Sequence, residues 1–114
     1  MTAIPPELLQ GTVDVLILRA LQEDALHGYA INRWLSERSD GRIVVNGAAL
    51  YQALHRLEHR GLVAASWGLS ENNRKAKYYR LTARGRKRLE AQSSAWSDYA
   101  HAVFRVLAPE GGER

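Results

Sequence analysis

The 114-residue chain contains no cysteine, one methionine, one phenylalanine and three prolines. Without cysteine it can form no disulfide, no thiolate metal site and no cysteine nucleophile. No apolar run is long enough to span a membrane, and the start, MTAIPPELLQ, lacks the basic and long apolar segments of a signal peptide. We therefore expect a cytoplasmic protein that does not interact with membranes.

The sequence also lacks the short motifs that most often indicate catalysis. It has no Gly-x-Ser-x-Gly, no phosphate-binding loop and no Gly-x-Gly-x-x-Gly. A length of 114 residues gives room for one domain with a modest core, and 46% hydrophobic with 25% charged residues is ordinary for a globular chain. These features predict a small protein that is not an enzyme and that uses no cofactor.

Positive charge is concentrated in one segment. The net charge is +4, and residues 74–88, RKAKYYRLTARGRKR, hold eight of the sixteen basic residues and no acidic one. A basic stripe with interleaved tyrosines is typical of nucleic-acid binding, because cations replace the counterions of the phosphate backbone. The alternative interpretation is a solvated, charged turn that leads into a helix.

Turn and cap residues divide the chain into elements. An apolar helix is expected over residues 8–21, and a second helix starts at His27 or Gly28 and ends at Gly41. The β-branched residues 42–45 predict a short strand, Asn46 caps a helix that Gly61 ends, and Thr82 caps a helix over 83–107. Residues 62–67 and 77–81 read as the two strands of a hairpin around a polar loop.

This order predicts a mainly α fold with a small β-hairpin, namely a winged helix-turn-helix followed by a long C-terminal dimerisation helix. The DNA-binding part would cover residues 1–81, and the dimerisation helix and tail residues 82–114. In such an architecture the third helix enters the major groove and the hairpin lies against the flanking backbone.

The helix over 47–60 has two faces. Leu50, Ala53, Leu54 and Leu57 form an inward stripe, which leaves small residues near the helix start and hydrogen-bonding side chains further along the outward face. That arrangement suits close approach to base edges and phosphates, although an ordinary solvated face is the alternative. The DNA-binding residues predicted on this helix and its cap are Asn46, Ala48, Ala49, Tyr51, Gln52, His55 and Arg56. Those predicted in the basic hairpin are Arg74, Lys75 and Lys77.

Residues 55–59, HRLEH, also match His-x-x-Glu-His, a signature of one class of zinc peptidases. His55 and His59 lie one helical turn apart and could share a metal, with Glu58 as the base. Such a site needs a third protein ligand, and no pattern organises either Glu71 or Glu90 for that role. We therefore predict no metal site, and a zinc hydrolase is kept only as an alternative.

Four segments together resemble the PadR family of transcriptional regulators: LLQGTVDVLILRAL, LHGYAI, VNGAALYQALHRLEHRGLV and SENNRKAKYYRLTARGRKRL. The last is similar to the acidobacterial-type subset. The resemblance, over about residues 8–90, implies a homodimeric repressor on a pseudo-palindromic operator, with Tyr51 on a phosphate. Many relatives have proline at Gln52 and acidic or larger residues near Gly47 and Ala48, so the operator contacts of this chain differ from theirs.

The last helix predicts the dimer independently, because Leu89, Trp96 and Val103 recur every seven residues. A partner chain is the natural cover for this stripe, and packing on the chain's own first helix is the alternative. The predicted dimerisation residues are Leu89, Trp96, Tyr99, Ala100, Val103 and Leu107.

Short relatives that bind planar drugs carry a tryptophan at the point of that helix that Trp96 matches. The resemblance therefore also implies a small planar or phenolic effector that binds at Trp96. The alternative is that Trp96 only anchors the dimer. The expected partners are double-stranded DNA, a second copy and such an effector. The alternative function is a winged-helix module that binds protein or RNA without an operator.

Overall fold

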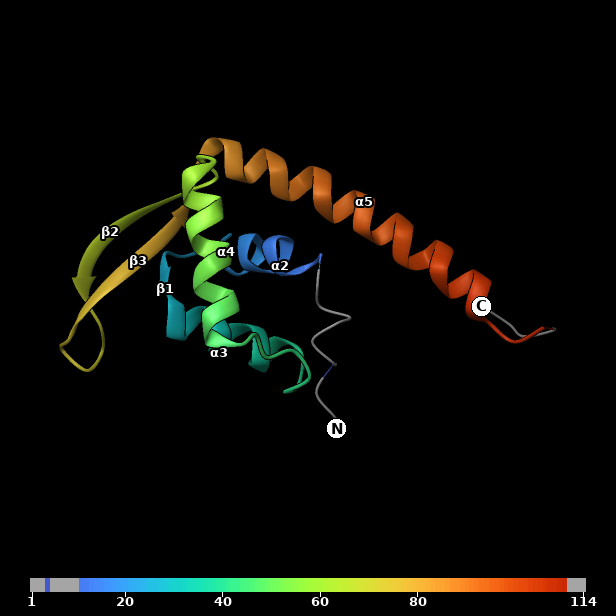
Figure 1. Ribbon diagram of the computed structural model, residues 1–114, viewed down its shortest axis with the longest axis horizontal. Coiled ribbons are helices and arrows are strands. Elements are labelled where there is room, and N and C mark those ends of the chain that lie inside the picture. The colour runs from blue at the N-terminus through green and yellow to red at the C-terminus, as the bar shows by residue number, and fades with distance from the viewer. Residues whose placement is uncertain (1–3, 5–10, 111–114) are drawn as a thin grey trace.

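The computed structural model describes residue 4 and residues 11–110. Its helices are α2 (Val13–Ala20), α3 (Gly28–Arg38), α4 (Gly47–His59) and α5 (Ala83–Leu107). Its strands are β1 (Leu26–His27), β2 (Val63–Leu69) and β3 (Lys75–Leu81), which form one antiparallel sheet in the order β1-β3-β2. The β2–β3 hairpin projects from one side of the helical cluster and α5 from the other (Figure 1). This is the predicted winged helix-turn-helix with a long last helix.

The core lies where α2, α3 and α4 meet. Ile17 and Leu18 of α2, with Ile31 of α3, are fully buried. The inward stripe predicted for α4 is confirmed, because Leu50, Ala53, Leu54 and Leu57 are all at most 2% exposed. Residues 13–20 show no exposed position, as expected for a largely buried first helix, and residues 8–10 of that prediction lie outside the described residues.

Cap residues set the helix ends as predicted. The His27 ring accepts a hydrogen bond from the backbone N–H of Ala30, so this histidine starts α3. Asn46 caps α4, and the Thr82 hydroxyl accepts from the N–H of Gly85 to begin α5. Gly61 has a φ of +75°, the left-handed conformation that ends α4 and that glycine adopts most easily.

The prediction of a strand at residues 42–45 is wrong. The side chain of Asn32 donates to the carbonyl of Val45 at 2.6 Å and accepts from its N–H at 3.0 Å. The hydroxyl of Ser39 accepts from the N–H of Ile43. Side chains of α3 thus satisfy the backbone groups that a neighbouring strand would otherwise pair, and the segment stays irregular.

A third strand forms at a place where no sequence pattern predicts one. Leu26 and His27 pair with Tyr79 and Tyr78 of β3, so the segment before α3 extends the sheet. The hairpin strands are also longer at their outer ends than predicted, and the loop shrinks to residues 70–74. We call the β2–β3 hairpin, residues 63–81, the wing.

Helix α5 is supported only near its start. Gly85 and Leu89 are its buried residues, and the rest of the helix runs away from the cluster (Figure 1). Its 25 residues correspond to about 37 Å. Within the described part of the chain, no helix combines the length and the apolar character that crossing a membrane requires.

Candidate nucleic-acid interface

The outward face of α4 is open, as the sequence predicts. Ala48, Ala49, Tyr51, Gln52, His55 and Arg56 are all exposed, and each is one of the predicted DNA-binding residues. The first turn is narrow because it holds Gly47 and two alanines. A groove wall could therefore approach the backbone here more closely than along the rest of the helix.

Asn46 caps the N-terminus of α4, where this exposed face begins. Its side-chain oxygen accepts from the N–H groups of Ala48 at 2.8 Å and Ala49 at 3.2 Å. The oxygen is thereby occupied, and the side-chain amide N–H groups are what Asn46 can still offer to a ligand. Its first role is to fix the start of α4.

Tyr51 is positioned by the start of α3. Its ring and hydroxyl lie so close to Gly28 that any Cβ there would overlap the phenol. The side chain stays 52% exposed, so it lies between α3 and solvent. A glycine at position 28 therefore allows the recognition helix to pack its tyrosine onto the neighbouring helix.

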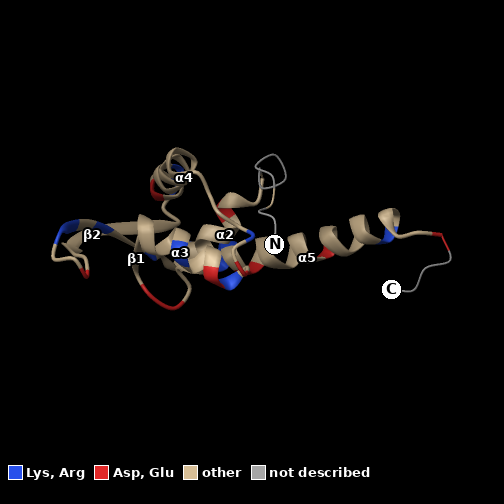
Figure 2. Cartoon of the chain, turned by 90° about the horizontal axis from the view of Figure 1, so that it is seen from below, with Lys and Arg blue, Asp and Glu red and all other residues tan. Residues whose placement is uncertain are grey.

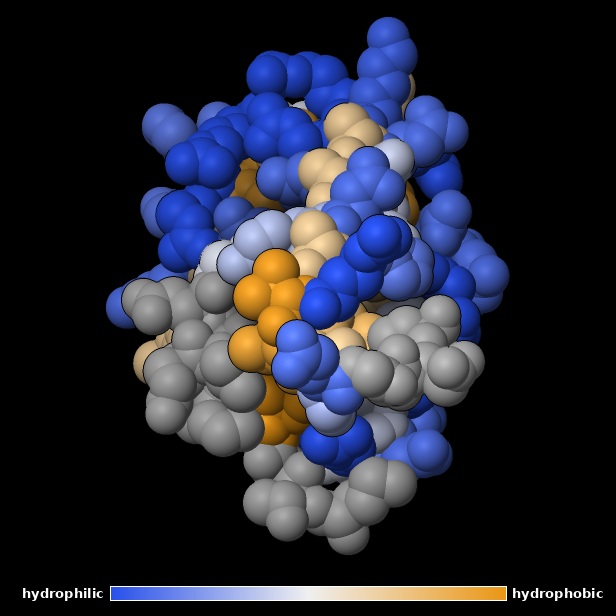
Figure 3. All heavy atoms as spheres, turned by 90° about the vertical axis from the view of Figure 1, so that its right-hand side faces the viewer, coloured by the Kyte–Doolittle hydropathy of each residue, from blue (hydrophilic) through white to orange (hydrophobic). Residues whose placement is uncertain are grey.

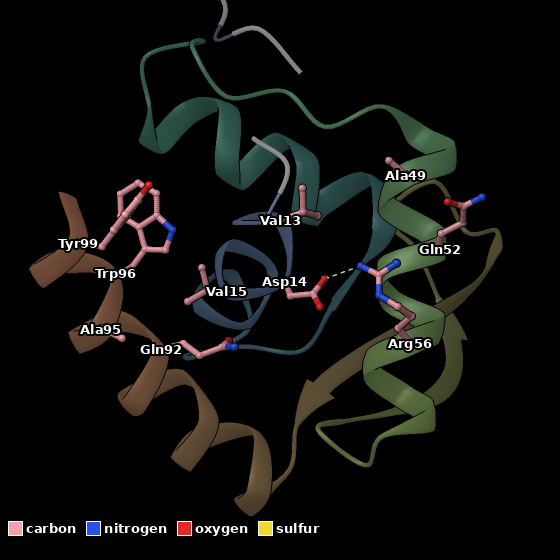
Figure 4. Close-up of a pocket in the computed structure, with 11 residues that line it drawn as sticks. Val13, Asp14, Val15, Ala49, Gln52, Arg56, Gln92, Ala95, Trp96 and Tyr99 are labelled. Atoms are coloured by element: carbon pink, nitrogen blue, oxygen red, sulfur yellow. Dashed lines mark hydrogen bonds and ion pairs between the residues drawn. The ribbon is translucent and has the colours of Figure 1, made fainter. Parts of the chain in front are cut away.

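Arg56 is held by α2. Its Nη2 donates to Asp14 Oδ1 at 2.7 Å, and Figure 4 shows the pair bridging the two helices. The arginine side chain remains 48% exposed. Arg56 is one of the predicted DNA-binding residues, and in this structure its charge is shared with a carboxylate.

Two of the wing's predicted cations also have partners. Lys77 Nζ lies 3.3 Å from Glu58 Oε1, which ties β3 to α4 and neutralises the one acidic side chain of that helix. Lys75 Nζ lies 5.3 Å from the centre of the Trp67 ring, in cation–π geometry. The Lys and Arg residues of the wing lie on β3 and in the hairpin loop, and Figure 2 shows their blue at this end of the molecule.

Glu71 is held by contacts that the sequence did not predict. Its carboxylate lies 3.2 Å from His27 Nε2 and 3.7 Å from Arg33 Nη2, so the hairpin loop is attached to the start of α3. A backbone hydrogen bond, and then the His27 hydrogen bond, lower the pKa of Glu71 below its ordinary value. Glu71 therefore serves the wing and is not associated with His55 and His59.

His55 and His59 are both exposed on α4. Across residue 4 and residues 11–110, no three His, Asp or Glu side chains come together in a way that could hold a metal ion. The HRLEH segment places both histidines on the outward face of α4.

The predicted dimerisation residues divide into two groups. Leu89 is 5% exposed and belongs to the core of this chain, so it cannot face a partner. Trp96, Tyr99 and Leu107 are 41%, 64% and 76% exposed. Two neighbours outside the predicted set are exposed as well, Phe104 at 54% and Val106 at 81%. Apolar side chains gather in the middle of the view onto the α5 end of the molecule (Figure 3).

A cavity of about 650 Å³ is lined by residues of α2, α4 and α5. Trp96, Tyr99 and Gln92 of α5 line one side, and Gln52 and Arg56 of α4 line the other (Figure 4). The rings of Trp96 and Tyr99 meet edge to face at 6.1 Å. Gln92 Oε1 is buried, and no described residue gives it a hydrogen bond.

The three-helix cluster, the exposed face of α4 and the basic wing define a winged helix-turn-helix protein, an architecture of DNA-binding proteins. The family described as the transcriptional regulator PadR-like family matches residues 17–91. The chain belongs to this family, whose members are transcriptional regulators and not enzymes.

Solved structures have the same fold. A transcriptional regulator from Clostridium thermocellum is 28% identical, with a TM-score of 0.80 over 94% of this chain and 100% of that one. A PadR family regulator from Eggerthella lenta is 31% identical, with a TM-score of 0.75 over 90% and 87%. Bacillus subtilis PadR, solved in complex with operator DNA, is 22% identical, with a TM-score of 0.65 over 73% and 46%.

Proposed function

We propose that the protein is a homodimeric repressor that binds a pseudo-palindromic operator. The exposed face of α4, bordered by the basic wing, carries this proposal. Gln52 can pair with a base edge, Tyr51 can meet a phosphate, and the small first turn permits close approach. Bacillus subtilis PadR, which has the same fold, was solved with operator DNA.

The dimer follows from α5. Its second half carries Phe104, Val106 and Leu107 at 54% to 81% exposure, and a surface of this kind is usually covered by a partner. The first half already packs on α2 of the same chain. The intramolecular alternative therefore accounts for the start of the helix, and a second copy would cover its end. In a dimer, two α4 helices would enter successive major grooves about 10 base pairs apart.

The effector is the third part of the proposal. A cavity of about 650 Å³ falls within the usual range for small-molecule sites, and it presents two aromatic rings and an unpartnered amide oxygen. A planar or phenolic ligand held at Trp96 would also contact Gln52 and Arg56 of α4. Occupancy would then shift α4 relative to the dimer helix and release the operator.

Selection of bound duplexes from a random pool tests the main proposal. We expect an inverted repeat, bound with a log affinity that falls against log salt with a slope near −5 if ~6 phosphates are neutralised. Binding to structured RNA in preference to every duplex would support the alternative module instead. Displacement of the selected duplex by a planar aromatic dye, abolished in Trp96→Ala, tests the effector.

A further inference from the structure

The outer half of β2 is an exposed and unprotected sheet edge. Trp67 is 65% exposed and Leu69 is 64% exposed, and β2 is the outer strand of the projecting hairpin (Figure 1). The strand reads VAASWGL, with no charged residue and no proline, and its register with β3 continues from Val63 to Leu69 without a bulge. Charged residues, prolines and bulges are the features that usually keep a sheet edge from pairing with another chain.

Backbone hydrogen-bonding groups point outward along this edge. The N–H of Ser70 donates to the carbonyl of Arg74 at 2.8 Å, so these two residues form a hydrogen-bonded pair of the hairpin. Such pairs alternate along an antiparallel ladder, so the even-numbered residues of β2 bond to β3. The N–H and C=O groups of Trp67 and Leu69 therefore face away from β3. Within the described residues, no strand pairs with this second edge of β2.

A second copy of β2 matches this edge. Directly opposite residues of an antiparallel pair have their side chains on one face. A two-fold axis through Gly68 therefore places Trp67 opposite Leu69 of the second copy, and Leu69 opposite its Trp67. Each of the two large exposed side chains then covers the other, and each pair exchanges both of its backbone hydrogen bonds. Because β2 carries no charge, the two strands meet without repulsion.

We propose that the outer half of β2 pairs in an antiparallel ladder with β2 of a second copy, about an axis through Gly68. This pairing goes beyond the proposed function, because it needs neither DNA nor the α5 interface, and it would link one proposed dimer to the next. Half a strand gives a smaller contact than a standard protein interface, so the pairing is weaker than the contact proposed for α5.

Introduced cysteines test the register, because the chain has none of its own. Ser66 would lie opposite Ser70 of the second copy as a non-hydrogen-bonded pair, with Cα atoms ~4.5 Å apart, a separation that a disulfide can bridge. A mixture of Ser66→Cys and Ser70→Cys should therefore form covalent dimers at least about 10-fold faster than either variant alone. Alone, each cysteine is four residues out of register with its own copy, ~13 Å along the strand.

The cross-linking is followed by electrophoresis without reductant and is repeated in a Leu107→Asp background. That substitution removes the proposed α5 contact, so the same preference for the mixture is expected if β2 alone brings the two copies together. A preference that disappears with Leu107→Asp would overturn the pairing, because the α5 dimer would then be what brings the cysteines together.

Sedimentation of the purified protein measures the reversible association. Wild type should form species larger than a dimer at concentrations about 10-fold above those at which the α5 dimer forms. Trp67→Ser and Leu69→Pro should each abolish them. The proline removes an N–H that faces outward, so the ladder with β3 is kept. Tyr29→Ser is the matched control, because Tyr29 is an aromatic residue of α3 that is 71% exposed, and it should associate as wild type does.

The salt dependence identifies the kind of contact. Added salt should strengthen the association, because β2 is uncharged while the β3 strands beside it carry Lys75, Lys77 and Arg80 on both copies. Copies bridged by residual nucleic acid would instead separate as salt is added. Larger species that disappear at high salt would therefore overturn the pairing.

The remaining outcomes are distinct. Preferential cross-linking of the mixture, together with loss of the larger species in Trp67→Ser and Leu69→Pro, supports the pairing. Equal cross-linking of the mixture and the single variants overturns the register about Gly68. Larger species that persist in both variants, or a wild type that forms none, overturn the use of the β2 edge. No DNA is present in these measurements, so their failure leaves the proposed regulator intact, and a protein that binds no duplex leaves the pairing intact.

Discussion

Arg56 of α4 donates to Asp14 of α2 across 2.7 Å, although the two residues are 42 positions apart in the sequence. Asp14 also lines the cavity that contains Trp96. The pair therefore connects the face proposed to meet DNA with the cavity proposed to hold an effector. With side chains 48% and 26% exposed, it contributes about 0.2–1 kcal/mol to stability, so its main effect is on where the guanidinium points.

Asp14→Asn should therefore release Arg56 to the phosphates. We expect tighter binding to all duplexes alike, a salt slope steeper by about 1, and a loss of unfolding free energy below about 1 kcal/mol. Affinity measured over a range of salt concentrations checks this. Asp14→Asn/Arg56→Ala is the control, since the gain should vanish in it. Unchanged affinity and slope in Asp14→Asn would show that Arg56 does not face the duplex.

Gln52 is the proposed base-reading residue. Gln52→Ala should change which base is preferred at one position of each half-site and cost ~1–3 kcal/mol on the best duplex. Selection with the variant, compared with wild type, measures this change. Lys75→Ala is the control, because losing a phosphate contact weakens all sequences alike. A uniform loss in Gln52→Ala would mean that the glutamine reads no base.

Gly28 and Tyr51 should be coupled in stability. A Cβ at position 28 would overlap the Tyr51 phenol, so Gly28→Ala should lower the unfolding free energy by ~1–3 kcal/mol, a typical cost of overpacking. In a Tyr51→Ala background the overlap is absent, and the same change should be neutral or stabilising because alanine favours helix. Denaturant unfolding of all four proteins gives the coupling energy. Additive effects would contradict the packing.

Much of the fold could be predicted because it is encoded locally. Thr82 and Asn46 cap their helices, Gly61 ends α4, and the last helix covers Ala83–Leu107 as its period predicted. These signals depend on neighbours within one or two turns. The outward face of α4 was likewise predictable, since its inner stripe leaves one orientation for the helix.

The errors concern contacts between distant residues. Three of residues 42–45 are β-branched, which predicts a strand, but Asn32 from α3 satisfies the backbone of Val45. Leu26 and His27 form a strand only because β3 lies beside them. Leu89 kept the heptad spacing of a dimer seam, yet its position near the start of α5 places it in the core. A periodic pattern identifies a buried face without identifying what covers it.

The link between Glu71 and His27 should appear in an acid titration. Because its pKa in the folded chain is lowered, Glu71 contributes stability above its ordinary value of 4.5, and this contribution is lost as the pH falls through the lower folded value. NMR shifts of the hairpin loop should titrate with a midpoint below 4.5, and thermal stability should fall in the same window. Glu71→Gln should abolish this titration, and Glu90→Gln should retain it. A wild-type midpoint at or above 4.5 would contradict the attachment of the loop.

The end of α5 is the proposed dimer interface. Leu107 is 76% exposed and lies near Val103 on the helix surface, so Leu107→Asp would bury a charge in the proposed interface. We expect the variant to sediment as a monomer at concentrations where wild type is a dimer, and to lose affinity for the inverted repeat because one α4 then binds alone. Arg105→Glu changes the charge on the side of α5 away from Leu107 and should remain dimeric. A dimeric Leu107→Asp protein would place the interface elsewhere, while the core around Leu89 should keep each monomer folded in either case.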